Sequence, residues 1–256
     1  MRGPHNIFRL IRTGATLERT GAMNVILDAY NAPWGVRFGA KVLGWPFQWL
    51  GYKGDTTMPP ATRALTALGP AYIKFGQILS TRPDVVGEEL AVQMRVLQDK
   101  LPPFPTADAK QMIEAELEQP LEGLFSEFSE PVAAASIAQV HRGKLISDGS
   151  NVAVKVLRPG IEKAFRRDID AFYFAARMIE TLAPSARRLR PLDVIAHFEG
   201  VVMGELDLRL ESSAAGEFAA NTEADLGFQL PKVNWNLSGK NVMTMDWAEG
   251  ISAGDN

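Results

Sequence analysis

The feature that most restricts the fold is a pair of β-prone segments joined by a short turn sequence. Residues 136–145 read SIAQVHRGKL, residues 147–150 read SDGS, and residues 151–157 read NVAVKVL. Apolar, β-branched segments on either side of an Asp-Gly turn are typical of two antiparallel strands. We therefore expect a β-hairpin near the middle of the 256-residue chain.

Helical patterns surround this hairpin. Residues 70–81, residues 88–99 and a segment that begins at Thr106 have the apolar spacing of helices, and Thr106 is expected to be an N-cap. Downstream, helices are expected over residues 161–182 and 191–220, followed by short strands near 228–233 and 241–247. Strands segregated from helices indicate an α+β fold rather than a doubly wound sheet.

The second strand of the hairpin carries a lysine beside a small residue. Because side chains alternate along a strand, the three valines of VAVKV face one side, and Ala153 and Lys155 face the other. A small residue leaves room for a flat ligand, and the lysine offers a cation to phosphates. Lysines on exposed strands are common, so this pattern alone leaves a solvated sheet face as the alternative.

The segment before the lysine strand is rich in small residues. Residues 131–141 read PVAAASIAQVH, and kinase-like proteins have a loop of small residues here so that the backbone can approach a nucleotide. Alanines stand where glycines would be expected, and alanine does not readily adopt positive φ, so this loop should be stiff. The alternative is that the alanines only pack.

An acidic motif, ELDLRLE, follows at residues 205–211. On one continuous helix Asp207 and Glu211 share a face, whereas Glu205 points elsewhere. A helix carboxylate that pairs with the strand lysine is the arrangement of kinase nucleotide sites. The alternative is a solvated acidic face in which Glu205 pairs with Arg209.

A fourth motif lies upstream, in the segment PAYIKFGQILSTRP at residues 70–83. Lys74 and Gln77 lie one turn apart on a common side of the expected helix. Gly76 lacks a side chain and would permit close approach of a facing backbone. The apolar residues of another side should pack against the body of the protein: Tyr72, Phe75 and Leu79.

These four motifs, in this order, resemble the UbiB family of atypical kinases, the ADCK/aarF-type proteins tied to ubiquinone biosynthesis. The resemblance runs from about residue 60 to the end and includes KFGQ, PVAAASIAQVH, NVAVKVLRPGIE and ELDLRLE. It implies a kinase-like N-lobe, a small antiparallel sheet plus helices, with a helical N-terminal extension. The expected domains are a basic, aromatic arm at 1–58, the KxGQ extension at 59–128 and the N-lobe at 129–256.

The resemblance also implies site residues and cofactors. Lys155 and Glu211 would form the catalytic ion pair, and Ala153 would line the nucleotide site. Backbone groups at a hinge would bind adenine, at Asp246, Trp247 and Ala248. A loop would cover the nucleotide, ATP or ADP with Mg²⁺, and would contain Ala133, Ala134, Ala135 and Ser136.

Two further pairs match regulatory motifs of the family. Lys74 and Gln77 match its KxGQ motif, which folds over the nucleotide as a lid. Glu205 and Asp207 match its ExD motif, so that Glu205 would pair with Lys74, and Asp207 would lie near the metal and phosphates.

Kinase-like catalysis also needs a second lobe, with a catalytic-loop aspartate and asparagine and a metal-binding aspartate. In this family those residues follow the hinge, and the sequence stops at Asn256. We therefore expect an N-terminal portion without the C-lobe, with little ATPase activity alone. The alternative is a non-catalytic, pseudokinase-like adaptor that binds a lipid or a partner.

Charge and aromatic residues make residues 1–53 distinct. Seven Lys and Arg against two acidic residues give +5 there, and the remaining 20 basic and 28 acidic residues give −8. Aromatic residues mixed with cations suit the headgroup zone of a bilayer, and an extension that packs them on the body is the alternative. The aromatic residues are Trp34, Phe38, Trp45, Phe47, Trp49 and Tyr52.

The expected partners follow from this charge and from the resemblance. They are a nucleotide, an anionic membrane surface, and a quinone-type lipid or ubiquinone-biosynthesis proteins, with a homodimer left open. Nucleic acid is not expected, because the body is acidic and no reading motif is present. The expected location is peripheral, on the cytoplasmic face of a bacterial inner membrane, with a mitochondrial matrix face as the alternative.

Overall fold

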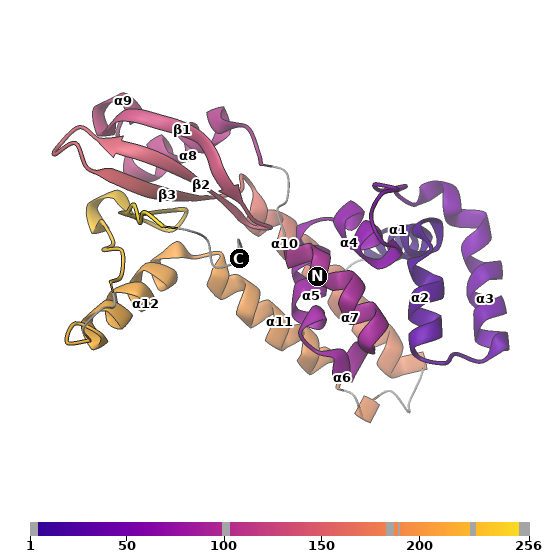
Figure 1. The fold of residues 1–256 in the computed structure, drawn as a ribbon. Coiled ribbons are helices and arrows are strands. Elements are labelled where there is room, and N and C mark those ends of the chain that lie inside the picture. Colours follow the sequence, from indigo (N-terminus) through magenta and orange to yellow (C-terminus); the bar gives the residue numbers. More distant parts are fainter. Residues whose placement is uncertain (1–4, 99–102, 183–186, 189, 226–228, 251–256) are drawn as a thin grey trace. The chain divides into compact units, whose positions relative to one another are not determined.

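The computed structural model describes residues 5–98, 103–182, 187–188, 190–225 and 229–250. The chain divides into two compact units: Met1–Lys100 with Glu162–Val201, and Leu101–Ile161 with Val202–Asn256. Helices build the first unit, and a four-stranded sheet with helices builds the second (Figure 1). The α+β class expected from the sequence is confirmed, and α10 falls with the helical unit rather than with the sheet.

Every secondary-structure element in the described part of the first unit is a helix. It comprises α1 (His5–Thr20), α2 (Ala22–Ala29), α3 (Trp34–Gly44), the 3₁₀ helix η1 (Trp45–Leu50), α4 (Pro60–Leu68), α5 (Pro70–Ser80), α6 (Pro83–Val86), α7 (Glu88–Arg95), η2 (Val96–Gln98), α10 (Ile161–Leu182) and most of α11 (Pro191–Glu205). Among the described residues, no helix is both long and apolar enough to cross a membrane.

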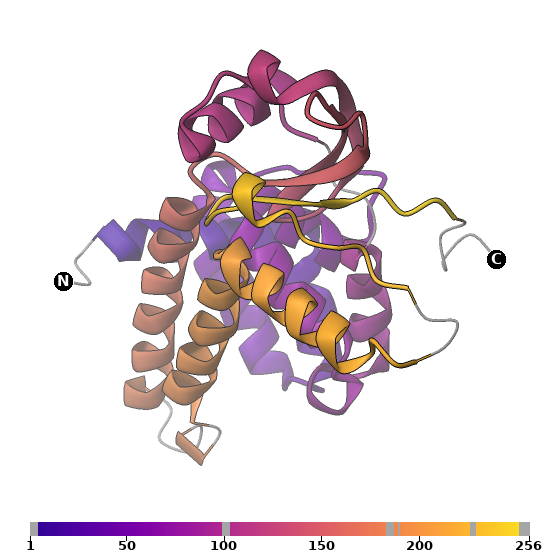
Figure 2. The same ribbon diagram turned by 90° about the vertical axis from the view of Figure 1, so that its left-hand side faces the viewer.

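Helices α10 and α11 lie side by side (Figure 2). The apolar residues Phe165 and Ile169 recur at helical spacing along α10 and are fully buried. The hydroxyl of Tyr173 on α10 donates a hydrogen bond to Glu199 on α11 over 2.8 Å. This pair of helices supplies one wall for α5.

The apolar side of α5 packs as expected. The ring of Tyr72 meets Phe172 of α10 edge-on at 4.7 Å, and Phe75 meets Phe198 of α11 at 5.3 Å. Close approach at Gly76 is also present, but a Cβ added there would meet side chains, 2.5 Å from Leu97 and 2.6 Å from Leu65, rather than a facing backbone.

The second unit is built on one antiparallel sheet in the order β1-β2-β3-β4. Its elements are α8 (Thr106–Leu117), α9 (Leu121–Leu124), β1 (Phe125–Ala134), β2 (Ala138–Leu145), β3 (Asn151–Leu157), α12 (Leu208–Asn221), η4 (Trp235–Leu237) and β4 (Val242–Asp246). The β2–β3 hairpin is the one expected. In its turn Asp148 accepts a hydrogen bond from the Ser150 N–H at 2.9 Å, and Gly149 adopts the left-handed φ of 72°.

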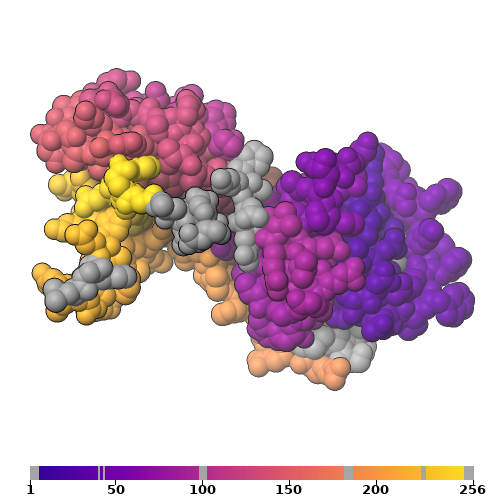
Figure 3. All heavy atoms as spheres, viewed as in Figure 1, coloured from indigo at the N-terminus to yellow at the C-terminus, as the bar shows by residue number. Residues whose placement is uncertain are grey.

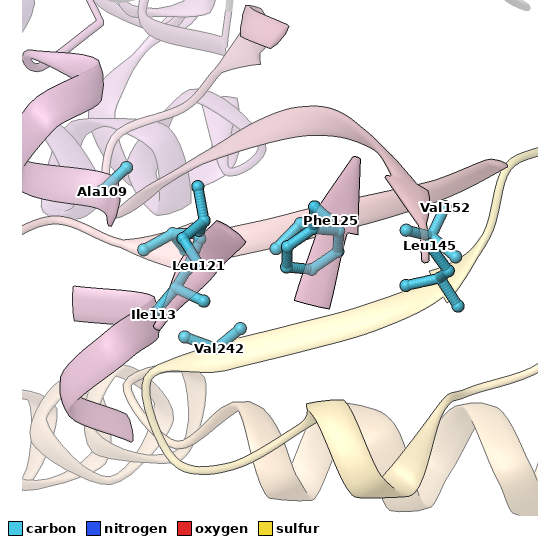
Figure 4. Close-up of a cluster of buried hydrophobic side chains, with 9 residues drawn as sticks. Ala109, Ile113, Leu121, Phe125, Leu145, Val152 and Val242 are labelled. Carbon is cyan, nitrogen blue, oxygen red and sulfur yellow. The ribbon is translucent and has the colours of Figure 1, made fainter. Parts of the chain in front are cut away.

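One face of this sheet forms the core (Figure 4). The three valines of β3 are at most 2% exposed and pack with Ile113 of α8, Leu121 of α9 and Phe125 of β1. Each fully buried valine contributes about 1.5–3 kcal/mol by the hydrophobic effect. The expected alternation of VAVKV is therefore confirmed, because Ala153 and Lys155 are only partly covered on the other face.

The single helix expected over residues 191–220 is wrong. The chain forms α11 and α12, with a break at Leu206 and Asp207. Asp207 has extended backbone angles, and its side chain caps α12 by accepting the N–H of Arg209 at 3.1 Å. Asp207 therefore does not share a helical face with Glu211.

Three smaller expectations also need correction. Thr106 is the first residue of α8 and does not cap it, because its hydroxyl bonds to Glu130. Strand β1 begins at Phe125, ahead of the expected hairpin at residues 136–157, and is an additional strand because Phe125 pairs with Leu145. Of the strand expected near 228–233, only an isolated bridge from Val233 to Met245 is present, and residue 228 lies outside the described residues.

Candidate functional site

The candidate site lies on the sheet face opposite the valine core. Paired residues on neighbouring antiparallel strands share a face, so Lys155 shares its face with Val140 of β2 and Met243 of β4. Ala153 lies two residues away on the same face. Helix α12 contributes Glu211 to this face.

Lys155 and Glu211 form a bidentate ion pair. The Nζ of Lys155 donates to both carboxylate oxygens of Glu211, at 2.6 and 2.7 Å. The side chains are 25% and 45% exposed, so this pair contributes at most about 1 kcal/mol to stability. The main effect of the pair is to fix the position of the Lys155 ammonium group on an accessible surface.

The start of α12 is anchored by a carboxylate from α8. Leu208 N–H donates to the carbonyl of Lys240 at 2.9 Å. Glu116 of α8 accepts from the N–H of Lys240 and from the side-chain amide of Asn241. A side chain at Gly239 would overlap Glu116. These contacts set the position of the helix that carries Glu211. The sequence analysis missed them because Glu116 and its partners are more than 100 residues apart.

The alanine-rich segment forms a tighter turn than expected. Ala133 and Ala134 are not in the loop, because they pair with Val140 and Gln139 at the end of β1. The turn contains residues 135–137 and is closed by the Ala135 N–H, which donates to Ala138 at 2.8 Å. Within it, Ser136 is buried.

Arg158 holds this turn. Its guanidinium group donates to the carbonyl of Ala135 at 3.1 Å, and its own N–H donates to Ile137 at 2.8 Å. The guanidinium group also lies over the ring of Phe104, 5.6 Å from the centroid. Burial lowers the pKa of Arg158 from its ordinary value. Arg158 immediately follows β3 in the sequence VLRPG. This position next to the lysine strand is the local signal that could have identified it.

The expected hinge residues lie at the end of β4 and line a pocket of about 540 Å³. The N–H groups of Asp246 and Trp247 donate to Lys232 and Asn151, at 3.0 and 3.1 Å. These two donors are thus used within the protein. The pocket is lined by Ala219, Thr222, Glu223, Gln229, Leu230, Pro231, Lys232, Asp246, Trp247 and Ala248.

The strand register gives the spacing between Lys155 and the end of β4, which lines the pocket. Lys155 is opposite Met243 on β4, whereas Asp246 is opposite Val152. Three residues along a strand correspond to roughly 10 Å. Asp246, at the end of β4, is therefore separated from the position opposite Lys155 by roughly 10 Å along the strand.

The Asp207 carboxylate, expected near a metal, forms an ion pair with Arg209. Its two carboxylate oxygens accept from Arg209 at 2.8 and 2.6 Å. The hydrogen bond from Arg209 lowers the pKa of the Asp207 carboxyl. The alternative pairing of Arg209 with Glu205 is thereby replaced by an Asp207–Arg209 pair. Within the described ranges, no group of three or more His, Asp or Glu side chains is placed to hold a metal ion.

The KxGQ residues lie on α5, in the first unit. The side-chain amide of Gln77 donates to the carbonyl of Leu97 at 2.7 Å and so fastens η2. Lys74 is half-buried on the same helix. Its expected partner Glu205 belongs to the second unit, and this pairing stays a prediction.

Known proteins resemble this chain over most of its length. The family described as "ABC1 atypical kinase-like domain" matches residues 96–256. A "Probable protein kinase UbiB" of Marinobacter nauticus is 42% identical over 193 residues, 75% of this chain and 35% of the relative. Proteins of the same name from Pseudomonas aeruginosa and Shewanella baltica are 38% and 37% identical, over 96% and 99% of this chain and 46% and 45% of theirs.

A solved structure is also similar to this chain. The complex of Rv3197 with erythromycin from Mycobacterium tuberculosis matches with a TM-score of 0.50 and 30% identity, over 72% of this chain and 46% of that one. The chain spans less than half the length of these relatives. The motifs, the kinase-like sheet with its Lys155–Glu211 pair, and these matches show that the chain belongs to the UbiB family of atypical kinases.

Proposed function

We propose that this chain supplies the ATP-binding part of an atypical kinase or ATPase that supports quinone-lipid biosynthesis. The observation that carries the proposal is the bidentate Lys155–Glu211 pair on the accessible face of the sheet. In kinase folds this pair presents the lysine to the nucleotide phosphates. The link to quinone lipids rests on the UbiB name of the relatives.

The residues of the second unit fit a nucleotide. The Lys155 ammonium group would bind the phosphates, and Ala153 leaves space beside it. The turn at 135–137, held by Arg158, would lie over the phosphates as a stiff cover. Adenine would bind at the end of β4 through groups other than the Asp246 and Trp247 N–H donors, because those two are engaged.

Magnesium fits less well than the nucleotide. Mg²⁺ in phosphoryl-transfer sites is held by one or two carboxylates together with substrate phosphates. Here Asp207 is the carboxylate expected to bind Mg²⁺, and its ion pair with Arg209 would have to break first. We therefore propose that the 256-residue chain binds ATP or ADP with little turnover, since phosphoryl transfer depends on positioned metal ions.

The relatives also bear on where in the cell this protein acts. The three curated relatives reported above are bacterial proteins named "Probable protein kinase UbiB". Quinone lipids reside in membranes, so we propose a peripheral protein at the cytoplasmic face of the bacterial inner membrane.

The test is a thermal-shift titration with MgATP and MgADP. A ligand at one hundred times its Kd stabilises the native state by about 2.7 kcal/mol, which corresponds to a rise of several degrees in melting temperature. We expect this rise in the wild type and its loss in Lys155→Ala. The matched control is Lys144→Ala on the neighbouring strand β2, whose partner is Glu127 at 3.7 Å.

Equilibrium dialysis with ADP provides a readout that does not depend on stability. Binding that survives Lys155→Ala, or absence of any nucleotide effect on the wild type, would favour the non-catalytic adaptor. Magnesium-dependent turnover that disappears in Lys155→Ala would contradict the proposal of a chain with little activity.

A further inference from the structure

Helices α3 and η1 carry an exposed row of large aromatic side chains. Trp34 is 80% exposed, Trp45 73%, Trp49 75% and Phe38 61%. These four residues are called the aromatic stripe below. Helix α3 lies at the rim of the first unit (Figure 1), and the space-filling view shows the violet end of that unit to which it belongs (Figure 3).

The spacing of Trp34 and Phe38 places them on one side of α3, and Trp45 follows directly where η1 continues from that helix. Trp34, Phe38 and Trp45 follow one another at intervals of four and seven residues, which return to the same side of a helix. Another side of α3 packs on α1, because a Cβ added to Gly44 would lie 2.8 Å from the side chain of Glu18. The exposed fractions of its four side chains show that the stripe faces outward, so the alternative in which the aromatic residues pack on the body does not hold for these four.

Hydrogen bonds hold this region in place. The guanidinium group of Arg37 donates to the carbonyl oxygens of Ala32 at 2.9 Å and Leu27 at 3.1 Å. After η1, Arg19 of α1 donates to the carbonyl of Gly51 at 2.7 Å. The stripe thus belongs to a folded region, and no element among the residues that the structure describes covers its apolar surface.

The charged residues of the segment that carries the stripe are all basic, although Arg37 pairs with Asp28 just before it. Residues 29–54 contain no Asp or Glu, although the chain as a whole has 30 in 256 residues. The same segment contains Arg37, Lys41 and Lys53, of which Lys41 lies on α3 between Phe38 and Trp45 and is exposed. If two copies of the chain met through this surface, their cations would lie close together. Repulsion between these like charges disfavours self-association.

We propose that the aromatic stripe is a membrane-docking surface that seats in the headgroup region of an anionic bilayer. Tryptophan is enriched at that depth, because its ring is apolar and its N–H is polar. The eleven residues of α3 extend about 16 Å, roughly half of a hydrocarbon core, so the helix lies along the surface rather than across it. Lys41 and Lys53 bind the anionic headgroups. This surface belongs to the helical unit and is independent of the nucleotide proposal.

The test is flotation of the full 256-residue chain with vesicles. One set contains phosphatidylglycerol mixed with phosphatidylcholine, and the other contains phosphatidylcholine alone. We expect binding to the anionic set that falls with added salt. The triple variant Trp34→Ala, Trp45→Ala, Trp49→Ala should bind at least roughly tenfold more weakly. The double variant Lys41→Gln, Lys53→Gln should lose roughly thirtyfold on anionic vesicles and nothing on neutral ones.

Matched controls separate the stripe from general surface effects. Trp235→Ala removes an exposed tryptophan of the second unit, and Lys163→Gln removes an exposed lysine of α10. Both should bind vesicles as the wild type does. Because the stripe is exposed, the triple variant should keep the wild-type melting temperature and its nucleotide response, so that failure of the nucleotide proposal would leave this result unchanged.

Three outcomes would overturn the proposal. Wild-type protein that stays at the bottom of the gradient with anionic vesicles is the first. Vesicle binding unaffected by the triple variant is the second. The third is a concentration-dependent dimer in sedimentation, abolished by the triple variant in the absence of vesicle binding, which would assign the stripe to contact between copies.

Discussion

Glu116 accepts a hydrogen bond from the side-chain amide of Asn241 over 2.7 Å, although 125 residues separate them. The same carboxylate accepts the N–H of Lys240, whose carbonyl receives the first N–H of α12. One side chain of α8 thereby determines where β4 begins and where the helix of Glu211 begins.

Replacement of Glu116 should therefore weaken the second unit. Hydrogen bonds to charged groups contribute about 1.5–3 kcal/mol each, and Glu116→Ala leaves two donors without their acceptor. We expect a loss of about 3 kcal/mol in free energy of unfolding by urea titration, and a weaker ADP affinity. Glu118→Gln, an exposed change just after α8, is the control and should stay within about 0.5 kcal/mol of the wild type. A Glu116→Ala variant as stable as wild type would contradict the anchoring role.

Arg158→Lys should loosen the turn at 135–137 without unfolding the sheet. Lysine cannot reproduce the two guanidinium contacts to the Ala135 carbonyl, at 3.1 and 3.3 Å. We expect amide hydrogen exchange at Ala135 to become roughly tenfold faster. Arg166→Lys, which changes an exposed arginine paired with Glu162, serves as the reference. Equal exchange in both variants would show that the turn closes without Arg158.

Gly76→Ala should destabilise the first unit although alanine favours helices. The added methyl group would lie 2.5 Å from Leu97 and 2.6 Å from Leu65, in a packed interior. Overpacking costs about 1–3 kcal/mol, against a gain of about 1 kcal/mol in helix propensity. We expect a net loss of about 1 kcal/mol in thermal unfolding. Gly200→Ala on α11 meets no atom within 4 Å and should instead be stabilising. The idea fails if both changes stabilise.

The stability of the first unit should fall in alkali because of Tyr72. Burial raises the pKa of Tyr72 to about 12, and its hydroxyl is bonded to Thr13 at 2.8 Å. The unfolded chain ionises this group near pH 10, so the stabilisation is complete below pH 10 and is lost as pH rises to about 12. The loss should amount to about 2–3 kcal/mol.

Tyr72→Phe isolates this contribution. It should cost about 1 kcal/mol at neutral pH through the lost hydrogen bond, yet show a smaller decline than wild type between pH 10 and pH 12. The exposed tyrosine in Tyr30→Phe is the comparison. Parallel alkaline profiles for wild type and Tyr72→Phe would exclude the buried hydroxyl as the cause.

Local patterns predicted the parts of the fold that depend on neighbours in sequence. The β2–β3 hairpin follows from strand-forming residues around Asp148 and Gly149, and the outward position of Lys155 follows from alternation along β3. The apolar side of α5 follows from helical spacing. Four motifs in family order were also sufficient to recognise the family.

Capping and turn closure were not predictable in this way. The break between α11 and α12 occurs where the Asp207 side chain and the distant Lys240 carbonyl satisfy the first N–H groups of α12. A continuous helical pattern hides such a break. The alanine turn is short because Ala133 and Ala134 complete β1 ladder pairs, and its stiffness comes from Arg158 as well as from alanine.

The sequence by itself determined the element types, the order of the motifs and the charge of the aromatic segment, because these depend on side chains close along the chain. Tertiary structure decided that Glu116 anchors both β4 and α12, and that the tryptophans of α3 and η1 face outward. Those outcomes depend on packing between elements far apart in sequence, where no local periodicity records the partner.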